Sequence, residues 1–480
     1  MRRTGLAAVL LLAGACATAR APLLAEPDRA RVPPLGPPPA LRLPPQVRFQ
    51  LENGLKVRLV EYHRLPIVAL QLLVDAGGVH DPEARPGLAS FTAGMMTEGT
   101  RGRSATQISD ALGAIGAHLG SGAGFDGAQL SAQALSTHLD PLLELFADVL
   151  QRPAFPPEDF ARVKDQRLVA LVQQRDQPGA IAGRAFAPLF WGSHPYGHAL
   201  SGTEESLRAV TREELAAFHA ARWRPGGAEL IVVGDVTRAE LEPRLRKALG
   251  GWTGAAPAPL AAAPPRQAAA RTVAIDKKGA PQAYLLLGMP GFPRSDPDHA
   301  AAQVAFEILG GGTASRLFRL LREEKGYTYG ISARPESRRL GGAAVVGGSV
   351  KADQAGEALA ALLGELSRMR DQPPSEEELA GARQGIVLSL PGDFATAGGI
   401  AGHLAEAALY GLPDDHYTRL AGQIAAVSAA DVQRAAGRWL DTGKLTAVLV
   451  CDTAQVVPQL GGLPLGPLEL RPAPAAAGGR

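Results

Sequence analysis

The strongest constraint on the fold is one segment pattern that occurs in both halves of the 480-residue chain. Residues 207–215 (LRAVTREEL) and residues 424–432 (IAAVSAADV) are each followed by an Arg-Trp pair, a Gly and an apolar strand pattern. Thr211 and Ser428 hold equivalent positions, where a hydroxyl side chain caps the start of a helix. Because self-similarity at a long interval marks repeated structural units, the chain is predicted to contain a duplicated domain of about 210 residues.

Strand and helix patterns are mixed in both halves. Residues 47–62 read as two strands around an Asn53-Gly54 turn, which is the strongest short hairpin signal. A long amphipathic helix is expected over Pro157–Gln174, and Ala228–Val233 closes the first half as a strand. Elements mixed in this order predict an α+β fold of two homologous domains, each a mixed sheet covered by helices.

Segments rich in Pro and Ala divide the chain. Residues 17–45 have the composition of an extended tether, and residues 254–270 that of a low-complexity linker. The predicted organisation is a signal peptide at 1–16, a tether at 17–45, an N-terminal domain at 46–253, a linker at 254–271, a C-terminal domain at 272–462 and a tail at 463–480.

The first residues have the pattern of an export signal. Arg2 and Arg3 precede the apolar run Leu6–Ala13. The next residues resemble a bacterial lipoprotein cleavage site with Cys16 as the lipidated residue. Cleavage at Ala15–Ala19 is the alternative and releases a soluble protein. Either way we expect secretion across the inner membrane into the periplasm, with lipid anchoring at Cys16 preferred.

Composition excludes some classes of function. The formal net charge is +2, so nucleic acid is not an expected partner. With Cys16 used or removed, Cys451 stands alone in a strand pattern, so we expect a buried, inert thiol and no disulfide or cysteine metal site.

A helix is expected at Gly87–Thr97, with apolar residues at helical spacing. Ser90, Ala93 and Gly94 lie along one side of it at the spacing of an HxxEH zinc site. Zinc at such a site needs imidazoles at the first and last positions and a Glu as general base beside the last. Serine, alanine and glycine supply none of these groups.

Several motifs in order resemble those of the pitrilysin (insulinase-like) zinc metallopeptidases. The motifs are LENGLKVRLVE, GLASFTAGMMTEGT, the loop His194-Pro195-Tyr196-Gly197, and SRLFRLLREEKGYTYG. The resemblance implies the LuxS/pitrilysin type of metalloenzyme fold, with two domains forming half of a clamshell around a peptide chamber. The family's third zinc ligand, a Glu, is expected near Ala170–Leu171, where no carboxylate stands. We therefore expect no metal in this chain.

The resemblance also supplies a positive signal. Arg322 and Tyr329 match a family pair that reaches the zinc site, in two-subunit members that of the other chain. A Tyr hydroxyl can donate to the oxyanion of peptide hydrolysis, and an Arg can hold the substrate backbone. The alternative is a purely structural role, with Arg322 in a surface ion pair and Tyr329 packed at the start of a strand.

Two further motifs favour structural roles. His194 and His198 are four residues apart, but Pro195 and Gly197 between them disfavour the helix that a ligand pair at this spacing needs, so a surface or turn pair is expected. Gly310-Gly311-Gly312 lacks the Lys-Ser/Thr of a phosphate loop, so it is predicted to end a helix.

The sequence thus predicts the non-zinc subunit of a heterodimeric peptidase, inactive alone. The expected partners are a homologous HxxEH subunit carrying the zinc, short or unfolded peptides, and a membrane through the lipid anchor. Two alternatives remain: a non-proteolytic scaffold, and a lipoprotein that binds peptides, as a homodimer, without cutting them.

Overall fold

Two six-stranded mixed sheets organise the computed structural model, which describes residues 41, 43–258 and 269–474. The first sheet has the order β1-β2-β6-β3-β5-β4 and the second the order β12-β7-β11-β8-β10-β9. Cys16, the predicted signal peptide and most of the predicted tether and linker lie outside the described residues.

The first half supplies one sheet and eight α-helices among the described residues. Its strands are β1 (Gln46–Gln50), β2 (Lys56–Glu61), β3 (Ile67–Val74), β4 (His118–Ala123), β5 (Ala128–Leu135) and β6 (Ala228–Gly234). Its helices are α1 (Leu88–Met95), α2 (Ala105–Ala114), α3 (Leu139–Gln151), α4 (Pro157–Gln173), α5 (Pro178–Trp191), α6 (Glu204–Ala209), α7 (Arg212–Arg222) and α8 (Arg238–Leu249).

The second half repeats this order of elements except at one sheet edge, where β12, the last described strand of the chain, takes the place of β1. Its strands are β7 (Arg271–Asp276), β8 (Gln282–Pro290), β9 (Thr328–Arg338), β10 (Gly341–Lys351), β11 (Thr446–Cys451) and β12 (Leu468–Pro472). Its helices are α9 (His299–Gly310), α10 (Arg316–Phe318, continued by a π-helical turn at Arg319–Glu324), α11 (Ala355–Asp371), α12 (Glu376–Asp393), α13 (Ala397–Tyr410), α14 (His416–Ala426), α15 (Ala429–Trp439) and α16 (Thr453–Val456). The predicted α+β fold of two mixed-sheet domains covered by helices is confirmed.

The repeated segment that predicted this duplication begins with equivalent helix caps. The Thr211 side chain accepts a hydrogen bond from the Glu214 amide at the start of α7, and the Ser428 side chain accepts one from the Asp431 amide at the start of α15. In both cases the acidic side chain in turn accepts a hydrogen bond from the backbone amide of the cap residue. Each pair of bonds therefore satisfies two backbone donors that have no partner within the helix. The helices lead into β6 and β11, which hold the same place in their sheets.

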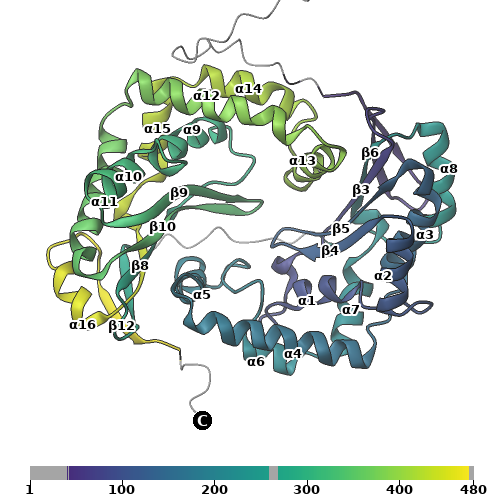
Figure 1. Cartoon of the computed structure of the whole chain (residues 1–480), viewed down its shortest axis with the longest axis horizontal. Coiled ribbons are helices and arrows are strands. Elements are labelled where there is room, and N and C mark those ends of the chain that lie inside the picture. Colours follow the sequence, from purple (N-terminus) through teal and green to yellow (C-terminus); the bar gives the residue numbers. More distant parts are fainter. Residues whose placement is uncertain (1–40, 42, 259–268, 475–480) are drawn as a thin grey trace, which may run out of the picture. The chain divides into compact units, whose positions relative to one another are not determined.

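The two halves exchange a helix. Helix α5 of the first half packs on β8 and β11, whereas α13 of the second half packs on β3 and β6 (Figure 1). Phe186 of α5 lies in a cluster with Val448 of β11, and Leu404 of α13 lies in the core that contains Ile231 of β6. Each central strand is therefore buried on both faces, which explains why β6 and β11 read as continuous apolar runs.

The contact between α5 and β8 depends on a glycine. Gly288 of β8 has no side chain, and a Cβ there would lie 2.2 Å from Cζ of Phe186. The absence of that carbon lets the aromatic ring of α5 rest directly on the strand.

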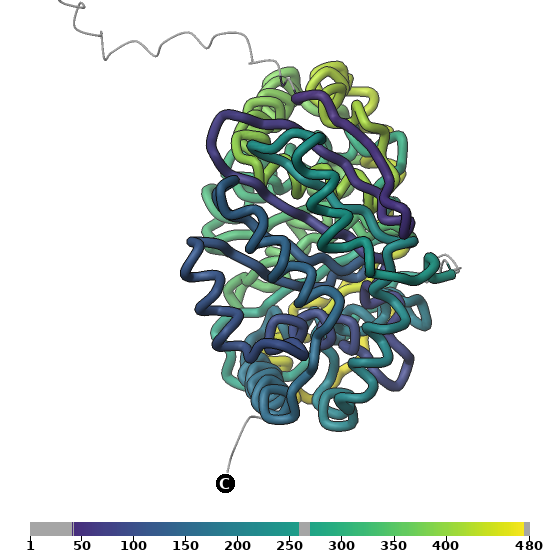
Figure 2. The backbone as a smooth tube through the Cα atoms, turned by 90° about the vertical axis from the view of Figure 1, so that its right-hand side faces the viewer, coloured from purple at the N-terminus to yellow at the C-terminus, as the bar shows by residue number. Residues whose placement is uncertain are grey.

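Polar contacts also join the halves. Arg339 donates to Asp75 at 3.1 Å, and Gln46 of β1 donates to the Asp414 carbonyl at 3.3 Å. The N-terminal strands accordingly run beside the C-terminal helices in the side view (Figure 2). Among the described residues, no helix combines the length and apolar character needed to cross a membrane.

Several local predictions can be compared directly with the structure. Gly310 is the last residue of α9, so the predicted helix end is confirmed. Cys451 is buried at the end of β11, where burial raises the pKa of its thiol to about 12, as expected for an inert thiol.

Candidate functional site

Helix α1 carries the three positions at which the resemblance implies zinc chemistry. Its start is fixed by Asp81, whose carboxylate accepts hydrogen bonds of 2.7 Å from the amides of Gly87 and Ala89. Burial raises the pKa of Asp81 to about 7, although these two bonds oppose the rise. Ser90, Ala93 and Gly94 follow on the helix, and none of them offers an imidazole or a carboxylate.

A cationic side chain lies over these positions. Arg167 of α4 donates from Nη1 to Ser90 Oγ at 3.0 Å and from Nη2 to the Ser90 carbonyl oxygen at 2.8 Å. Its guanidinium also lies 4.7 Å from the ring centre of Phe91, which is a cation–π contact. Gly94 makes this placement possible, because a Cβ at Gly94 would lie 2.6 Å from Nη2 of Arg167.

The charge of Arg167 is not neutralised by a neighbouring acid. Burial alone lowers the pKa of its guanidinium to about 10, so the side chain stays protonated at neutral pH. A zinc ion at this place would meet the positive charge of Arg167 and no ligand on α1. The residues present therefore do not fit zinc.

No other metal site is evident in the described part of the chain. Within residues 41, 43–258 and 269–474, no group of three or more His, Cys, Asp or Glu side chains is arranged to hold a metal ion. The sequence predicts the third-ligand position near Ala170–Leu171. In the structure, the residue of α4 that contacts Ser90 is Arg167, one helical turn earlier.

The structure brings Arg322 and Tyr329 together. Nη1 of Arg322 donates to the Tyr329 carbonyl oxygen at 2.6 Å, and its guanidinium lies 4.3 Å from the Tyr329 ring centre. The same guanidinium lies 4.9 Å from the ring centre of Phe318, so it sits between two aromatic rings. Tyr329 is the second residue of the edge strand β9 and is 82% exposed.

This arrangement suits contact with a group outside the chain. The neighbouring Tyr327 is buried and donates its hydroxyl to Glu357, which is a structural role. Tyr329 differs, because its ring is exposed and its main chain is held by Arg322. An exposed phenol with a fixed backbone can donate a hydrogen bond to a substrate oxygen.

The loop at His194-Pro195-Tyr196-Gly197 forms a turn, as predicted, but His194 is not at the surface. It is only 8% exposed and packs 5.0 Å from the ring centre of Trp191. His198 faces Asp81, with its Nε2 3.1 Å from Oδ2. The surface interpretation of His194 was wrong because the aromatic residues of α5 cover the loop.

Tyr196 ties this loop to the second half. Its hydroxyl donates to Asp126 and accepts a hydrogen bond of 3.1 Å from the Leu340 amide. Burial, with the nearby Asp126 charge, raises the pKa of the Tyr196 hydroxyl far above its ordinary value. The loop therefore has a structural role at the junction of the halves.

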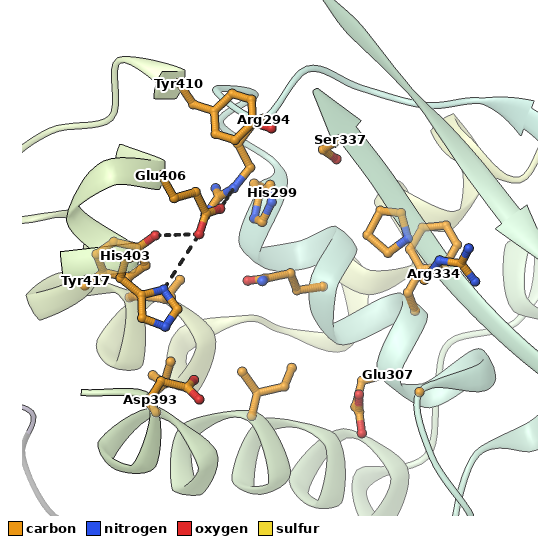
Figure 3. A pocket seen from close by; sticks show the side chains of 18 of the residues that line it. Arg294, His299, Glu307, Arg334, Ser337, Asp393, His403, Glu406, Tyr410 and Tyr417 are labelled. Carbon is orange, nitrogen blue, oxygen red and sulfur yellow. Dashed lines mark hydrogen bonds and ion pairs between the residues drawn. The ribbon is translucent and has the colours of Figure 1, made fainter. Parts of the chain in front are cut away.

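A cavity of about 840 Å³ is lined mainly by α9, α12, α13 and β9 of the second half, and β3 and β5 of the first half complete its lining (Figure 3). At one end Arg294 donates to Glu406 at 2.9 Å, and Tyr417 donates to the same carboxylate at 2.9 Å. Burial raises the pKa of Glu406, but His403, Arg294 and Tyr417 together lower it to about 2. Burial and the Arg294 charge lower the pKa of His299 to about 3, so this imidazole is neutral.

Comparison with known proteins places the chain in a family. Residues 56–204 match the family model described as insulinase, peptidase family M16, and residues 209–386 match the model described as peptidase M16 inactive domain. The chain belongs to peptidase family M16. The pitrilysin-like resemblance of the sequence is therefore confirmed.

Curated relatives are about a quarter identical to this chain over the parts that align. A Mycobacterium leprae protein described as an uncharacterized zinc protease is 28% identical over 59% of this chain and 64% of its own length. A Bacillus subtilis protein with the same description is 23% identical over 72% of this chain and 83% of its own length. The match spans less than two thirds of the Mycobacterium leprae protein.

Solved M16 structures share the fold. A peptidase M16 inactive domain from Pseudomonas fluorescens is 29% identical, with a TM-score of 0.80, and the match covers 85% of this chain and 98% of that one. A Helicobacter pylori protease superposes with the same TM-score at 19% identity, covering 85% of this chain and 100% of that one.

Sequence reasoning missed Arg167 and the cavity. Arg167 stands one helical turn before the position tested for a carboxylate, and a search for any charged residue on that face of α4 would have found it. The cavity draws its polar residues from elements far apart in the chain, among them α9, β9, α12, α13 and α14, and no motif joins these elements in the sequence.

Proposed function

We propose that this M16 protein is the non-zinc subunit of a heterodimeric metallopeptidase. In this role it presents Arg322 and Tyr329 to the zinc site of a homologous partner that carries an intact HxxEH helix. The observation that carries the proposal is the pairing of Arg322 with an exposed Tyr329 in a chain whose own metal positions cannot hold zinc.

The chemistry of the pair supports the proposal. Peptide hydrolysis develops negative charge on the carbonyl oxygen, and a Tyr hydroxyl can donate to it. Arg322 holds the Tyr329 carbonyl oxygen and stacks on its ring, so the position of this tyrosine is fixed before substrate arrives. Preorganised donors of this kind contribute more than mobile ones, because no reorganisation is needed at the moment of reaction.

The state of α1 supports the absence of independent activity. Arg167 lies where the metal chemistry would be, and its positive charge has no acid beside it. In the proposal, the zinc, its general base and the catalytic water belong to the partner. This chain supplies a wall of the chamber and the two side chains.

The decisive experiment mixes the purified chain with its HxxEH homologue and follows hydrolysis of a short fluorogenic peptide. We expect no turnover from either chain alone and turnover from the mixture. Tyr329→Phe in this chain should lower kcat by about 10²–10³-fold, the usual effect of removing one oxyanion donor.

A matched control tests whether the effect is local. Tyr62→Phe removes an exposed hydroxyl that makes only a 3.5 Å contact with the Ala395 carbonyl oxygen, and it should leave turnover unchanged. Undiminished turnover of the Tyr329→Phe mixture, or proteolysis by this chain alone, would contradict the proposal.

We further propose that the chain is exported to the periplasm and anchored by lipid at Cys16, with short or unfolded peptides as substrates. Metabolic labelling with palmitate tests the anchor. Wild-type protein should take up label and sediment with membranes, whereas Cys16→Ser should do neither.

A further inference from the structure

We propose that Arg167 of α4, where it lies against α1, forms a binding site for the carboxylate group of a peptide. In this proposal the guanidinium of Arg167 stands where a zinc enzyme has its metal, and it binds the ligand's oxygen atoms by donating hydrogen bonds to them. The inference does not rest on the proposed partnership, because it concerns binding by this chain alone.

The first argument is the state of the charge. Arg167 contacts only Ser90 Oγ and the Ser90 carbonyl oxygen, and both are neutral acceptors. Across residues 43–258 and 269–474, no Asp or Glu side chain pairs with its guanidinium. A partly buried cation without a counter-ion is costly, and an anionic ligand would remove that cost.

Neighbouring acids are committed to other cations. Glu98 and Asp159 both pair with Arg162, on the same helix α4. Glu214 pairs with Arg85 at 2.9 Å. The lack of an acid beside Arg167 is therefore a local feature of a surface that is elsewhere rich in ion pairs.

The second argument is the fixed orientation of the guanidinium. A guanidinium has five N–H donors in one plane, and Ser90 engages only two of them. Phe91 lies against the plane, and Phe91 is itself stacked on Phe160 with ring centres 5.4 Å apart. A planar fork held in this way matches a carboxylate better than a mobile lysine does.

The third argument is room. Gly94 lets the guanidinium lie against the backbone of α1, because a Cβ there would lie 2.6 Å from Nη2 of Arg167. On the neighbouring strand β4, which contacts α1, a Cβ at Gly122 would meet nothing within 4 Å. Open space therefore lies at Gly122, on the strand that packs beside α1.

The test is direct binding by the full chain, followed by fluorescence polarisation. The probes are dansyl-tetraalanine as the free acid, the same peptide as its C-terminal amide, and an amidated peptide with one internal Glu. We expect the free acid to bind about tenfold to a hundredfold tighter than the plain amide, the range typical of hydrogen bonds to a charged group. The Glu peptide then tells whether a side-chain carboxylate serves as well as a chain end.

Variants assign the effect to the site. Arg167→Gln should bring the free acid to the affinity of the amide, and Arg167→Lys should keep an intermediate preference because it keeps charge without the fork. Arg162→Gln is the matched control on the same helix and should leave the preference intact. Circular dichroism checks that each variant is folded, and the lysine variant serves if the glutamine variant is not.

Three outcomes would overturn the proposal. They are equal binding of acid and amide, a preference that survives Arg167→Gln, and no binding of any probe at millimolar concentration.

Discussion

Arg322 holds Tyr329 by two contacts at once: a 2.6 Å hydrogen bond to its carbonyl oxygen and a stacking contact 4.3 Å from its ring centre. The arginine therefore fixes both the backbone and the ring of an 82% exposed residue. In the proposed peptidase, the role of Arg322 is to hold Tyr329 in position.

This relationship predicts non-additive kinetics. In the reconstituted heterodimer, Arg322→Ala and Tyr329→Phe should each lower kcat, and the double variant should be little worse than the poorer single variant. The physical reason is that the arginine acts through the tyrosine, so the second loss removes little more. Steady-state rates of the four mixtures give the coupling. Effects that multiply would show that Arg322 acts separately from Tyr329.

Zinc binding should be recoverable only when Arg167 is replaced. Ser90→His with Gly94→His places two imidazoles on α1, but the guanidinium opposes the metal and a Cβ at Gly94 lies 2.6 Å from its Nη2. Repulsion between unit charges 4 Å apart is about 4 kcal/mol at an effective dielectric constant of about 20. Adding Arg167→Glu removes the repulsion and supplies a carboxylate, so this triple variant should bind zinc more than about a hundredfold tighter than the double variant.

A chelating indicator in competition measures these zinc affinities. Arg167→Gln in the double-histidine background is the control, because it removes the charge without adding a ligand, and its affinity should fall between the other two. Tight zinc binding by the double-histidine variant itself would show that the charge of Arg167 does not prevent zinc binding at this site.

The sequence predicted the duplicated α+β fold well but not how the two copies interlock. The Thr211 and Ser428 caps and the strands after them are local patterns, and they are read correctly because neighbouring residues decide them. Helices α5 and α13 were not predicted. Their apolar faces pack on the sheet of the other half, and such long-range packing leaves no signal in either segment alone.

The candidate site shows the same division. Loss of the metal ligands at Ser90 and Gly94, and the spacing of Arg322 and Tyr329, are visible in the sequence. The placement of Arg167 over Ser90 depends on the packing of α4 against α1, 77 residues apart in the chain, so it needed the structure.

The exchanged helix α5 gives a packing prediction. Gly288→Ala would place a carbon 2.2 Å from Cζ of Phe186 and should lower the free energy of unfolding by about 1–3 kcal/mol, the usual penalty for overpacking. Phe186→Leu in the same chain should recover part of the loss. Urea unfolding measures both. Gly437→Ala is the control, since nothing lies within 4 Å of its added carbon in α15, and it should be neutral or slightly stabilising.

Tyr196 gives a prediction for the junction of the halves. Tyr196→Phe leaves the buried Asp126 carboxylate and the Leu340 amide without this partner. Unsatisfied buried groups cost about 1–3 kcal/mol, so the free energy of unfolding should fall by about that amount. Tyr62→Phe should change it little, because that hydroxyl is exposed. Equal unfolding midpoints for the wild type and Tyr196→Phe would show that the junction does not depend on this bond.

His219 gives a pH dependence. Burial lowers the pKa of its imidazole from the ordinary 6.5 to about 4, and its Nε2 lies 2.9 Å from the Leu150 carbonyl oxygen. Between pH 4 and 6.5 the unfolded chain therefore binds more protons at this residue than the folded chain. Its contribution to stability is complete above about pH 6.5 and is lost as the pH falls toward 4.

The measurement compares the wild type with His219→Gln, which keeps a donor but does not titrate. The difference in unfolding free energy between the two should change by about 3 kcal/mol from pH 7 to pH 4, with the wild type losing more. His118→Gln is the matched control, because His118 is exposed on β4. A pH-independent difference for His219→Gln would contradict the prediction.

Because α5 and α13 each pack on the sheet of the other half, neither half can bury its own sheet alone. Cutting at the linker would strip each sheet of a helix that its own half does not encode, and would bare the apolar surfaces around Val448 and Ile231 to water. The duplicated halves are thus obligate companions: expressed as separate fragments they should aggregate, and co-expressed they should reassemble into one particle.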